Sequence, residues 1–249
     1  MEVHAHTHTP RKKWTHYFWE FLMLFLAVFC GFLAENQREH YIEHQREKQY
    51  IHSMIEDLKT DTANLAGVIE GLTRKSSQLD SVIIGFDEGA AAYNKIWAQL
   101  FLRSYRMGYP DFFPTDRTIQ QLKNSGGLRL IRNERAANGI ISYDALAKDN
   151  SNEDANISNS QVKYIDEILN VWSVKKMFRD AGVTSWFRNR NMTVKNNYWL
   201  STDPETKERV FNRLTDFNEA ILRQIKFDND LREEAIRLIE ILKKEYHLD

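Results

Sequence analysis

The stretch from Ile51 to Phe86 reads IHSMIEDLKTDTANLAGVIEGLTRKSSQLDSVIIGF, and its apolar residues recur every seven positions. The residues at this interval are Ile51, Leu58, Leu65, Leu72, Leu79 and Phe86, and Ile55, Ile69 and Ile83 fill the offset position in alternate heptads. Such spacing places apolar side chains along one stripe of a helix. Because Thr62 and Ser76 interrupt the offset stripe, we predict a long helix of a bundle rather than a regular coiled coil.

The helical pattern extends upstream without a break. Residues 35–50 contain no glycine or proline and interleave acidic with basic side chains, which stabilises an exposed helix. Before them, Tyr17 to Ala34 reads YFWEFLMLFLAVFCGFLA, with Glu20 as the only charge. About 20 helical residues cross a hydrocarbon core of roughly 30 Å. We therefore predict a transmembrane helix over 14–34 that continues into a long stalk helix.

The flanks of this apolar segment indicate a retained anchor with a defined orientation. A cleaved signal peptide needs a small residue three positions before the cut, where this chain has Phe29 or Phe32. Three basic residues, 11–13, directly precede the segment, whereas the three that follow it begin only at Arg38. The positive-inside rule then favours a cytoplasmic tail over 1–13 and a periplasmic helical stalk and bundle domain over 35–249.

One face of the apolar helix combines an acid with small residues. At 3.6 residues per turn, Glu20, Ala27, Gly31 and Ala34 share this face, and phenylalanines occupy another. Small residues four apart let a second helix approach closely, and an acid in a bilayer usually faces protein or water. We predict a membrane interface with a membrane-protein partner or a second copy. In the alternative interpretation, Glu20 reaches the headgroups and the small residues are ordinary membrane-helix composition.

The remainder of the chain carries helix signals and no alternating strand pattern of useful length. Asp203 followed by Pro204 predicts the start of a C-terminal helix that folds back antiparallel on the long one. Its apolar stripe comprises Phe217, Ile221, Leu231, Leu238 and Leu242. The expected fold is all-α: one N-terminal transmembrane helix continuing into a stalk, and an antiparallel helical bundle.

The middle of the chain predicts three shorter helices and one aromatic stripe. We expect a helix that Thr115 caps and that ends at Asn124, a second from Asn133 to about Lys148, and a third over roughly 153–179, which carries Ile157, Ile165, Ile168 and Trp172 and stops at Gly182. The aromatic residues Tyr93, Trp97, Phe101 and Tyr105 are spaced by four, as in the core face of a helix.

Composition and motifs argue against several function classes. Lys and Arg number 34 against 35 Asp and Glu, so no net field attracts nucleic acid. Cys30, the single cysteine, lies in the apolar segment, which excludes disulfides and thiolate metal sites from the soluble part. The only faintly elbow-like spot, Ser125 before Gly126 and Gly127, is interpreted as a helix end. We expect no enzyme activity, no cofactor and no small-molecule substrate.

Two groups of histidines are candidate metal ligands. His4, His6 and His8 alternate in the tail and would point the same way in an extended chain. His40 and His44 lie one helical turn apart, with Glu47 next on that face. The alternatives are a disordered tail, because ordering three flexible ligands is costly, and a solvated stalk.

The first sixty residues carry a resemblance to known sequences: the three tail histidines, EFLMLFLAVFCGFLAE over 20–35, the triplet Arg38-Glu39-His40 and EDLKTD over 56–61. The stretch NSGGLRLIRN over 124–133 is a further match. The chain resembles a family of uncharacterised single-pass inner-membrane proteins of Gram-negative bacteria. This resemblance implies residence in the inner membrane and transfers no activity.

These observations together predict a non-enzymatic structural or interaction protein that is anchored in the bacterial inner membrane and acts through helix–helix contacts. Its expected partners are the lipid bilayer and another membrane protein or a second copy. The alternative is a proton- or metal-responsive sensor or regulatory subunit of a membrane complex, in which Glu20 or the histidines respond. A hydrolytic enzyme is the third hypothesis.

Overall fold

The computed structural model describes residues 14–87, 95–106, 108–185, 198–201 and 203–248. Its helices are α1 (Trp14–Asp87), α2 (Lys95–Arg106), α3 (Arg117–Asn124), the 3-10 helix η2 (Gly127–Leu130), α4 (Glu134–Val171), α5 (Val174–Ala181) and α6 (Pro204–Glu245). The chain divides into two units, Met1–Tyr50 and Ile51–Asp249. In the described residues the only strand-like pairing is one isolated bridge, so the predicted all-α class is confirmed.

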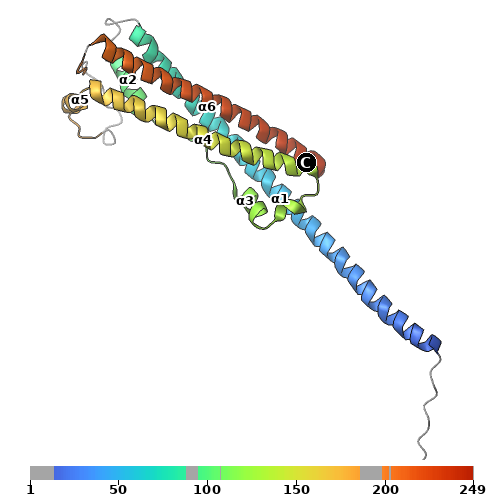
Figure 1. The fold of residues 1–249 in the computed structure, drawn as a ribbon. Helices are drawn as coiled ribbons and strands as arrows, with labels where there is room; N and C mark the ends of the chain where they lie inside the picture. The colour runs from blue at the N-terminus through green and yellow to red at the C-terminus, as the bar shows by residue number, and fades with distance from the viewer. Residues whose placement is uncertain (1–13, 88–94, 107, 186–197, 202, 249) are drawn as a thin grey trace, which may run out of the picture. The chain divides into compact units, whose positions relative to one another are not determined.

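The second unit is a bundle of three long helices (Figure 1). The Ile51–Asp87 part of α1 and all of α4 run in the same direction, and α6 runs antiparallel to both (Figure 1). Two side-chain hydrogen bonds support this arrangement. Tyr143 of α4 donates to Asp61 of α1, and Ser76 of α1 donates to Asn218 of α6. The antiparallel return of the C-terminal helix is therefore as predicted.

The heptad stripe of α1 is the buried seam of this bundle. Five of its six residues, Ile51, Leu58, Leu65, Leu72 and Leu79, are fully buried, with 0% of their surface exposed. In the offset stripe Ile55 is buried, and Ile69 and Ile83 are half-buried. The side chain of Phe86 lies outside the described residues. A seam of this kind removes a continuous apolar surface from water, at about 1.5–3 kcal/mol per side chain.

Helix α6 forms as the sequence predicts. Asp203 is its N-cap and accepts a hydrogen bond from the Thr206 amide at 2.9 Å, and Pro204 occupies the first turn. The whole predicted stripe, Phe217, Ile221, Leu231, Leu238 and Leu242, is buried. Its contact with α4 is close, because a Cβ added to Gly139 would lie 2.7 Å from Cδ1 of Leu238.

The predicted break between two middle helices is wrong, since α4 is one helix from Glu134 to Val171. The helix begins where predicted, and Asn133 is its N-cap, accepting a hydrogen bond from the Ala136 amide at 3.0 Å. The polar run DNSN over 149–152 reads as a turn by propensity, yet it stays helical. Asn150 is 1% exposed and its amide donates to Asp228 of α6 at 2.9 Å, so tertiary contact overrides local preference.

The predicted continuation of this helix to Arg179 is also wrong, because α4 ends at Val171 and α5 begins at Val174. Trp172 between them has extended backbone angles and pairs with Trp199 in the isolated bridge. Two backbone hydrogen bonds of 2.8 Å fasten the pair: the Ser173 amide donates to the Tyr198 carbonyl, and the Leu200 amide donates to the Val171 carbonyl. Gly182, in the left-handed conformation, ends α5 as predicted.

The short helix α3 is held from outside by α1. Thr115 is not its cap: Asp116 occupies that position without a side-chain cap hydrogen bond. Instead Asp57 of α1 accepts from the Thr118 amide at 3.2 Å and from the Arg117 guanidinium, and Asp61 accepts from the Thr115 amide at 2.8 Å. Carboxylates are favourable at helix N-termini, so two acids one turn apart on α1 dock α3 onto the bundle.

Helix α3 ends at Asn124, as predicted. Ser125 is the C-cap, and its hydroxyl donates to the Gln121 carbonyl at 2.6 Å. Gly126 follows with a φ of 66°, a conformation that favours glycine.

Of the predicted aromatic stripe, Phe101 in α2 is 1% exposed and belongs to the core. Tyr93 and the side chains of Trp97 and Tyr105 lie outside the described residues.

Candidate functional site

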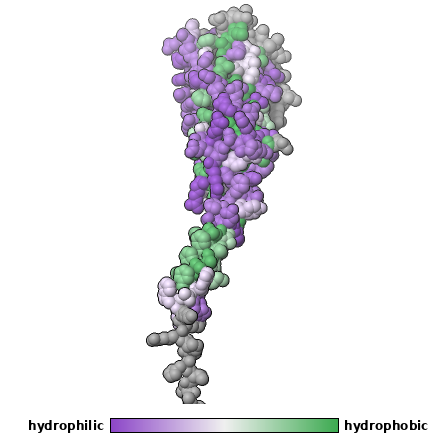
Figure 2. All heavy atoms as spheres, turned by 90° about the vertical axis from the view of Figure 1, so that its right-hand side faces the viewer, coloured by the Kyte–Doolittle hydropathy of each residue, from purple (hydrophilic) through white to green (hydrophobic). Residues whose placement is uncertain are grey.

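The N-terminal part of α1 is apolar and fully exposed. Among the described helices, α1 alone is long and apolar enough to cross a membrane by length and composition. Its most apolar window has a mean hydropathy of 2.0, and none of that window is buried. Figure 2 shows these residues as an apolar band, in contrast to the mostly polar atoms on the visible face of the bundle. Exposed surface of this kind marks contact with lipid or with another protein.

The face predicted as a membrane interface is present and uncovered. Glu20, Ala27, Gly31 and Ala34 are all exposed. A Cβ built on Gly31 would meet nothing within 4 Å, so the face is free to receive another helix. Glu20 has a local partner that the sequence reasoning missed: its Oε1 lies 3.0 Å from Nε2 of His16, one turn earlier. The sequence could have predicted this pair, because residues four positions apart are neighbours on the surface of a helix.

Aromatic rings line another face of the same segment. Phe21 and Phe25 are stacked with their ring centroids 6.3 Å apart, and Phe25 and Phe29 follow at 5.8 Å. These rings are exposed, at 46–64% of their surface. The segment therefore has one smooth face of small residues and one ridge of stacked rings, which differ in how closely a second helix can approach.

The candidate metal ligands do not converge in the described part of the chain. His40 pairs with Glu43 at 3.8 Å, and Nδ1 of His44 lies 3.3 Å from the Glu47 carboxylate. No set of three or more histidine, cysteine or acidic residues suited to a metal ion occurs among the described residues. His4, His6 and His8 lie outside them. An open hollow on this stretch of α1 is lined by Ala34, Gln37, Arg38, His40, Tyr41 and His44.

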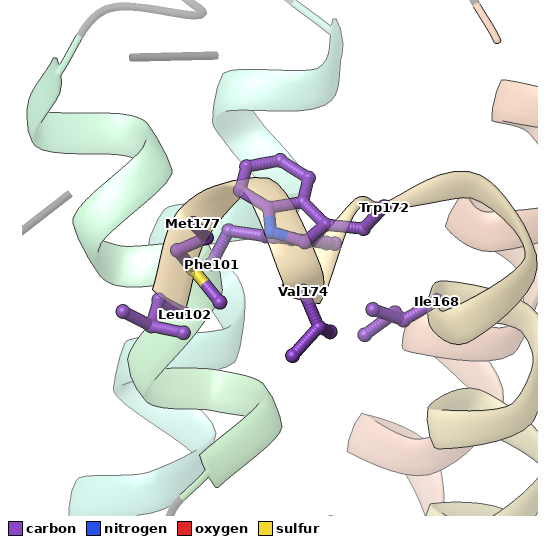
Figure 3. A pocket seen from close by; sticks show the side chains of 6 residues that line it. All are labelled: Phe101, Leu102, Ile168, Trp172, Val174 and Met177. Atoms are coloured by element: carbon purple, nitrogen blue, oxygen red, sulfur yellow. The ribbon is translucent and has the colours of Figure 1, made fainter. Parts of the chain in front are cut away.

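Figure 3 shows a small apolar cavity at one end of the bundle, lined by Phe101, Leu102, Ile168, Trp172, Val174 and Met177. The cavity measures about 10 Å³, which is the space of one water molecule at most. The Trp172 ring packs against Phe101 with centroids 4.9 Å apart and against Trp199 at 5.5 Å. This aromatic cluster is a packed core and holds no room for a substrate.

Several ionisable side chains lie inside the bundle, and sequence reasoning missed them. Lys75 of α1 is 3% exposed; its Nζ donates to the Ser104 carbonyl at 2.7 Å and lies 5.6 Å from the centre of the Phe217 ring. Burial lowers the pKa of Lys75 to about 8. Beside it, the Ser104 hydroxyl and the Tyr164 hydroxyl are hydrogen-bonded at 2.8 Å, and burial raises the Tyr164 pKa.

A second polar layer joins α4 to α6. Asp228 is 0% exposed, and its Oδ1 accepts hydrogen bonds from the amides of Asn150 at 2.9 Å and Gln224 at 3.0 Å. The Gln224 amide also donates to Oδ1 of Asn150 at 2.9 Å. Oδ2 of Asp228 and Oε1 of Gln224 are buried and have no hydrogen-bond partner among the described residues. Burial raises the pKa of Asp228, although the two amide donors oppose this shift.

Asp154 extends this layer towards the segment that precedes α3. Burial, followed by the negative charges of Asp228 and Asp111, raises the pKa of Asp154 to about 7. Burial also raises the pKa of Asp111. Tyr109 faces the same group: burial and the charges of Asp111 and Asp154 raise its pKa, and a hydrogen bond with Ser158 opposes the rise.

A signal for these buried polar residues was present in the sequence. Buried residues of α4 alternate in spacing between three and four: Ala136, Ile140, Tyr143, Ala147, Asn150, Ile157. Asp154 occupies the core position that this series leaves between Asn150 and Ile157. In α6, Gln224 and Asp228 likewise continue the series between Ile221 and Leu231. Extending the heptad register through polar residues would have located the layer.

The described residues thus present two candidate sites: the uncovered apolar segment of α1 with its small-residue face, and the carboxylate layer between α4 and α6. Neither resembles an arrangement of nucleophile, base and oxyanion donors. Comparisons with known protein families, with characterised proteins and with solved structures give no match for this chain.

Proposed function

We propose that this chain is a non-enzymatic, single-pass membrane protein that acts as a structural or interaction partner through helix–helix contacts. The observation that carries the proposal is the α1 segment, whose most apolar window is entirely exposed. Leaving it in water would be unfavourable by about 25 cal/mol for each Å² of apolar surface. A bilayer removes this surface from water at no cost in backbone hydrogen bonding, because a helix satisfies its own backbone groups.

The bundle supports an interaction role rather than catalysis. Its described interior is filled by apolar seams and by hydrogen-bonded polar layers, and the enclosed cavity beside Trp172 is too small for a substrate. The small-residue face around Gly31 is the surface best suited to a partner helix, because no described residue of this chain lies within 4 Å of a Cβ built on Gly31. The expected partner is a second copy of this chain or another membrane protein.

The proposed location is the bacterial inner membrane, with residues 1–13 in the cytoplasm and the bundle in the periplasm. The basic residues at 11–13 immediately before the apolar segment support this orientation. The resemblance of the first sixty residues to single-pass inner-membrane proteins supports the choice of membrane.

Protease protection in a Gram-negative host tests this proposal. Protease added to spheroplasts should digest the bundle and leave the N-terminal tail intact, as detected with a tag at each end. The matched control is a variant with Arg11, Lys12 and Lys13 changed to glutamine, which should show mixed orientation. A bundle that is protected in intact spheroplasts and digested only after lysis would refute the orientation. Release of the full chain by alkaline carbonate washing would refute membrane integration.

A further inference from the structure

Asp154 of α4 and Asp228 of α6 lie where these two helices pack together, because Asn150, one turn before Asp154 on α4, donates a hydrogen bond to Asp228. Asp111 belongs to the segment before α3. The negative charges of Asp228 and Asp111 both raise the pKa of Asp154. Tyr109, hydrogen-bonded with Ser158 of α4, also faces Asp111 and Asp154. Asp228 is fully buried and Asp154 is half-buried, whereas Asp111 is exposed. Like charges near a buried position favour the neutral form of one member.

No basic group in the described residues neutralises this acidic layer. Asp228 receives two amide hydrogen bonds at one oxygen, and its other oxygen is buried without a hydrogen-bond partner. Arg232, one turn further along α6, has a buried Nε without a partner and makes no ion pair with Asp228. The charges within this part of the bundle are therefore unbalanced.

Helix α1, the third wall, does not supply the missing cation either. It meets the Tyr109–Asp111 segment at Gly71, where an added Cβ would lie 2.6 Å from Cγ of Pro110. The buried lysine of α1, Lys75, donates to the carbonyl of Ser104 instead. The amide hydrogen bonds to Asp228 come from neutral groups, so they leave its negative charge without a counter-charge.

We propose that Asp154 and Asp228 form a proton-binding pair that makes the packing of α4 against α6 respond to pH. At low pH the pair holds a proton and the two helices pack without charge repulsion. As the pH rises the proton leaves, the carboxylate of half-buried Asp154 repels that of buried Asp228, and the α4–α6 contact is weakened. The proposal concerns the bundle alone and does not depend on membrane insertion or orientation.

The sign of the effect follows from proton linkage. An aspartate in the unfolded chain titrates at about pH 3.9. Burial and the charges of Asp228 and Asp111 raise the pKa of Asp154 to about 7 in the folded bundle. Between these two values the folded state binds a proton that the unfolded state has lost, so the stability of the bundle decreases as the pH rises. The decrease is complete once the pH exceeds the folded-state pKa.

The test uses the full-length protein in detergent micelles, with the thermal midpoint of the bundle followed by circular dichroism from about pH 5 to about pH 8. The wild-type midpoint should fall across this range. Asp154→Asn keeps the shape of the side chain and removes the charge, so its midpoint should fall much less and should exceed that of the wild type at the highest pH. An equal fall in Asp154→Asn and in the wild type would overturn the proposal.

The matched control is Asp166→Asn, which removes an exposed carboxylate from the same helix and should leave the fall unchanged. The other titratable groups are the same in every variant, so only the difference between variants reports on the pair. Should Asp154→Asn fail to fold, Asp111→Asn provides the test. Removal of this repelling charge should lower the pKa of Asp154, so the midpoint should fall by less than in the wild type and should level off at a lower pH. A fall equal to that of the wild type would overturn the proposal.

Discussion

Asp61→Ala should destabilise the bundle strongly, because Asp61 holds two elements together from a fully buried position. Its Oδ1 accepts a hydrogen bond from the Thr115 amide at 2.8 Å, and its Oδ2 accepts one from the Tyr143 hydroxyl at 2.7 Å. Hydrogen bonds to a charged group contribute about 1.5–3 kcal/mol each, and both donors would be left without their acceptor. We expect a loss of about 3–5 kcal/mol in the free energy of unfolding, measured by chemical denaturation of the full-length protein in detergent.

Two matched variants separate this role from a general effect of mutation in α1. Tyr143→Phe removes one of the two bonds and should cost about 1–2 kcal/mol, whereas Glu56→Ala removes an exposed acid and should leave the free energy of unfolding nearly unchanged. Burial and the Asp61 charge raise the pKa of Tyr143, so Asp61→Asn should also allow its phenol to ionise at lower pH. If Asp61→Ala costs no more than Glu56→Ala, the docking role is refuted.

Two further predictions test the seam and the membrane face. Leu72→Ala, at a position with 0% exposure, should lower the free energy of unfolding by about 2–5 kcal/mol. The control, Leu222→Ala at an exposed position, should change it by about 0.5 kcal/mol or less. Equal effects of the two substitutions would show that the seam does not stabilise the bundle. In a Cys30→Ser background, Gly31→Cys should crosslink to a partner helix more efficiently than Phe25→Cys, and equal yields from the two positions would remove the small-residue face as an interface.

The parts of the fold that sequence patterns predicted are those in which one strong periodicity repeats. The seam from Ile51 to Leu79 and the stripe from Phe217 to Leu242 are buried as expected, because many residues contribute to one pattern and no single exception changes it. The start of α6 was equally clear, since Asp203 and Pro204 combine two independent helix-start signals.

The parts that could not be predicted depend on contacts between residues distant in the sequence. The run over 149–152 favours a turn locally, whereas contacts with α6, 74 and 78 positions away, favour a continuous α4: Asn150 bonds with both Gln224 and Asp228. Likewise α4 ends at Val171, next to Trp172, which pairs with the distant Trp199. The local signal is weak, since it consists of Ser173, the N-cap of α5. Local propensity is worth less than 1 kcal/mol per residue and is overridden by such contacts.

The two candidate sites also differ in how far the sequence predicted them. The small-residue face around Gly31 was predicted from helical spacing alone, and the structure adds the contact between His16 and Glu20. The acidic layer of Asp154 and Asp228 was missed because polar residues were not considered as core positions. Their heptad register places them in the interior, but which donors surround them is decided by packing in three dimensions.

The distance along the chain between the partners of α1 has a consequence for biosynthesis. The hydroxyl of Ser76 meets the Asn218 side chain 142 residues later, so this part of the seam is covered only when α6 has left the ribosome. Until then the nascent chain displays a row of leucines beside an apolar segment that is already able to enter a bilayer. Closing so large a loop is slow compared with helix formation, and exposed apolar surface promotes aggregation in the meantime. A chain that stops before α6 would therefore expose its seam permanently and become a substrate for chaperones and proteases.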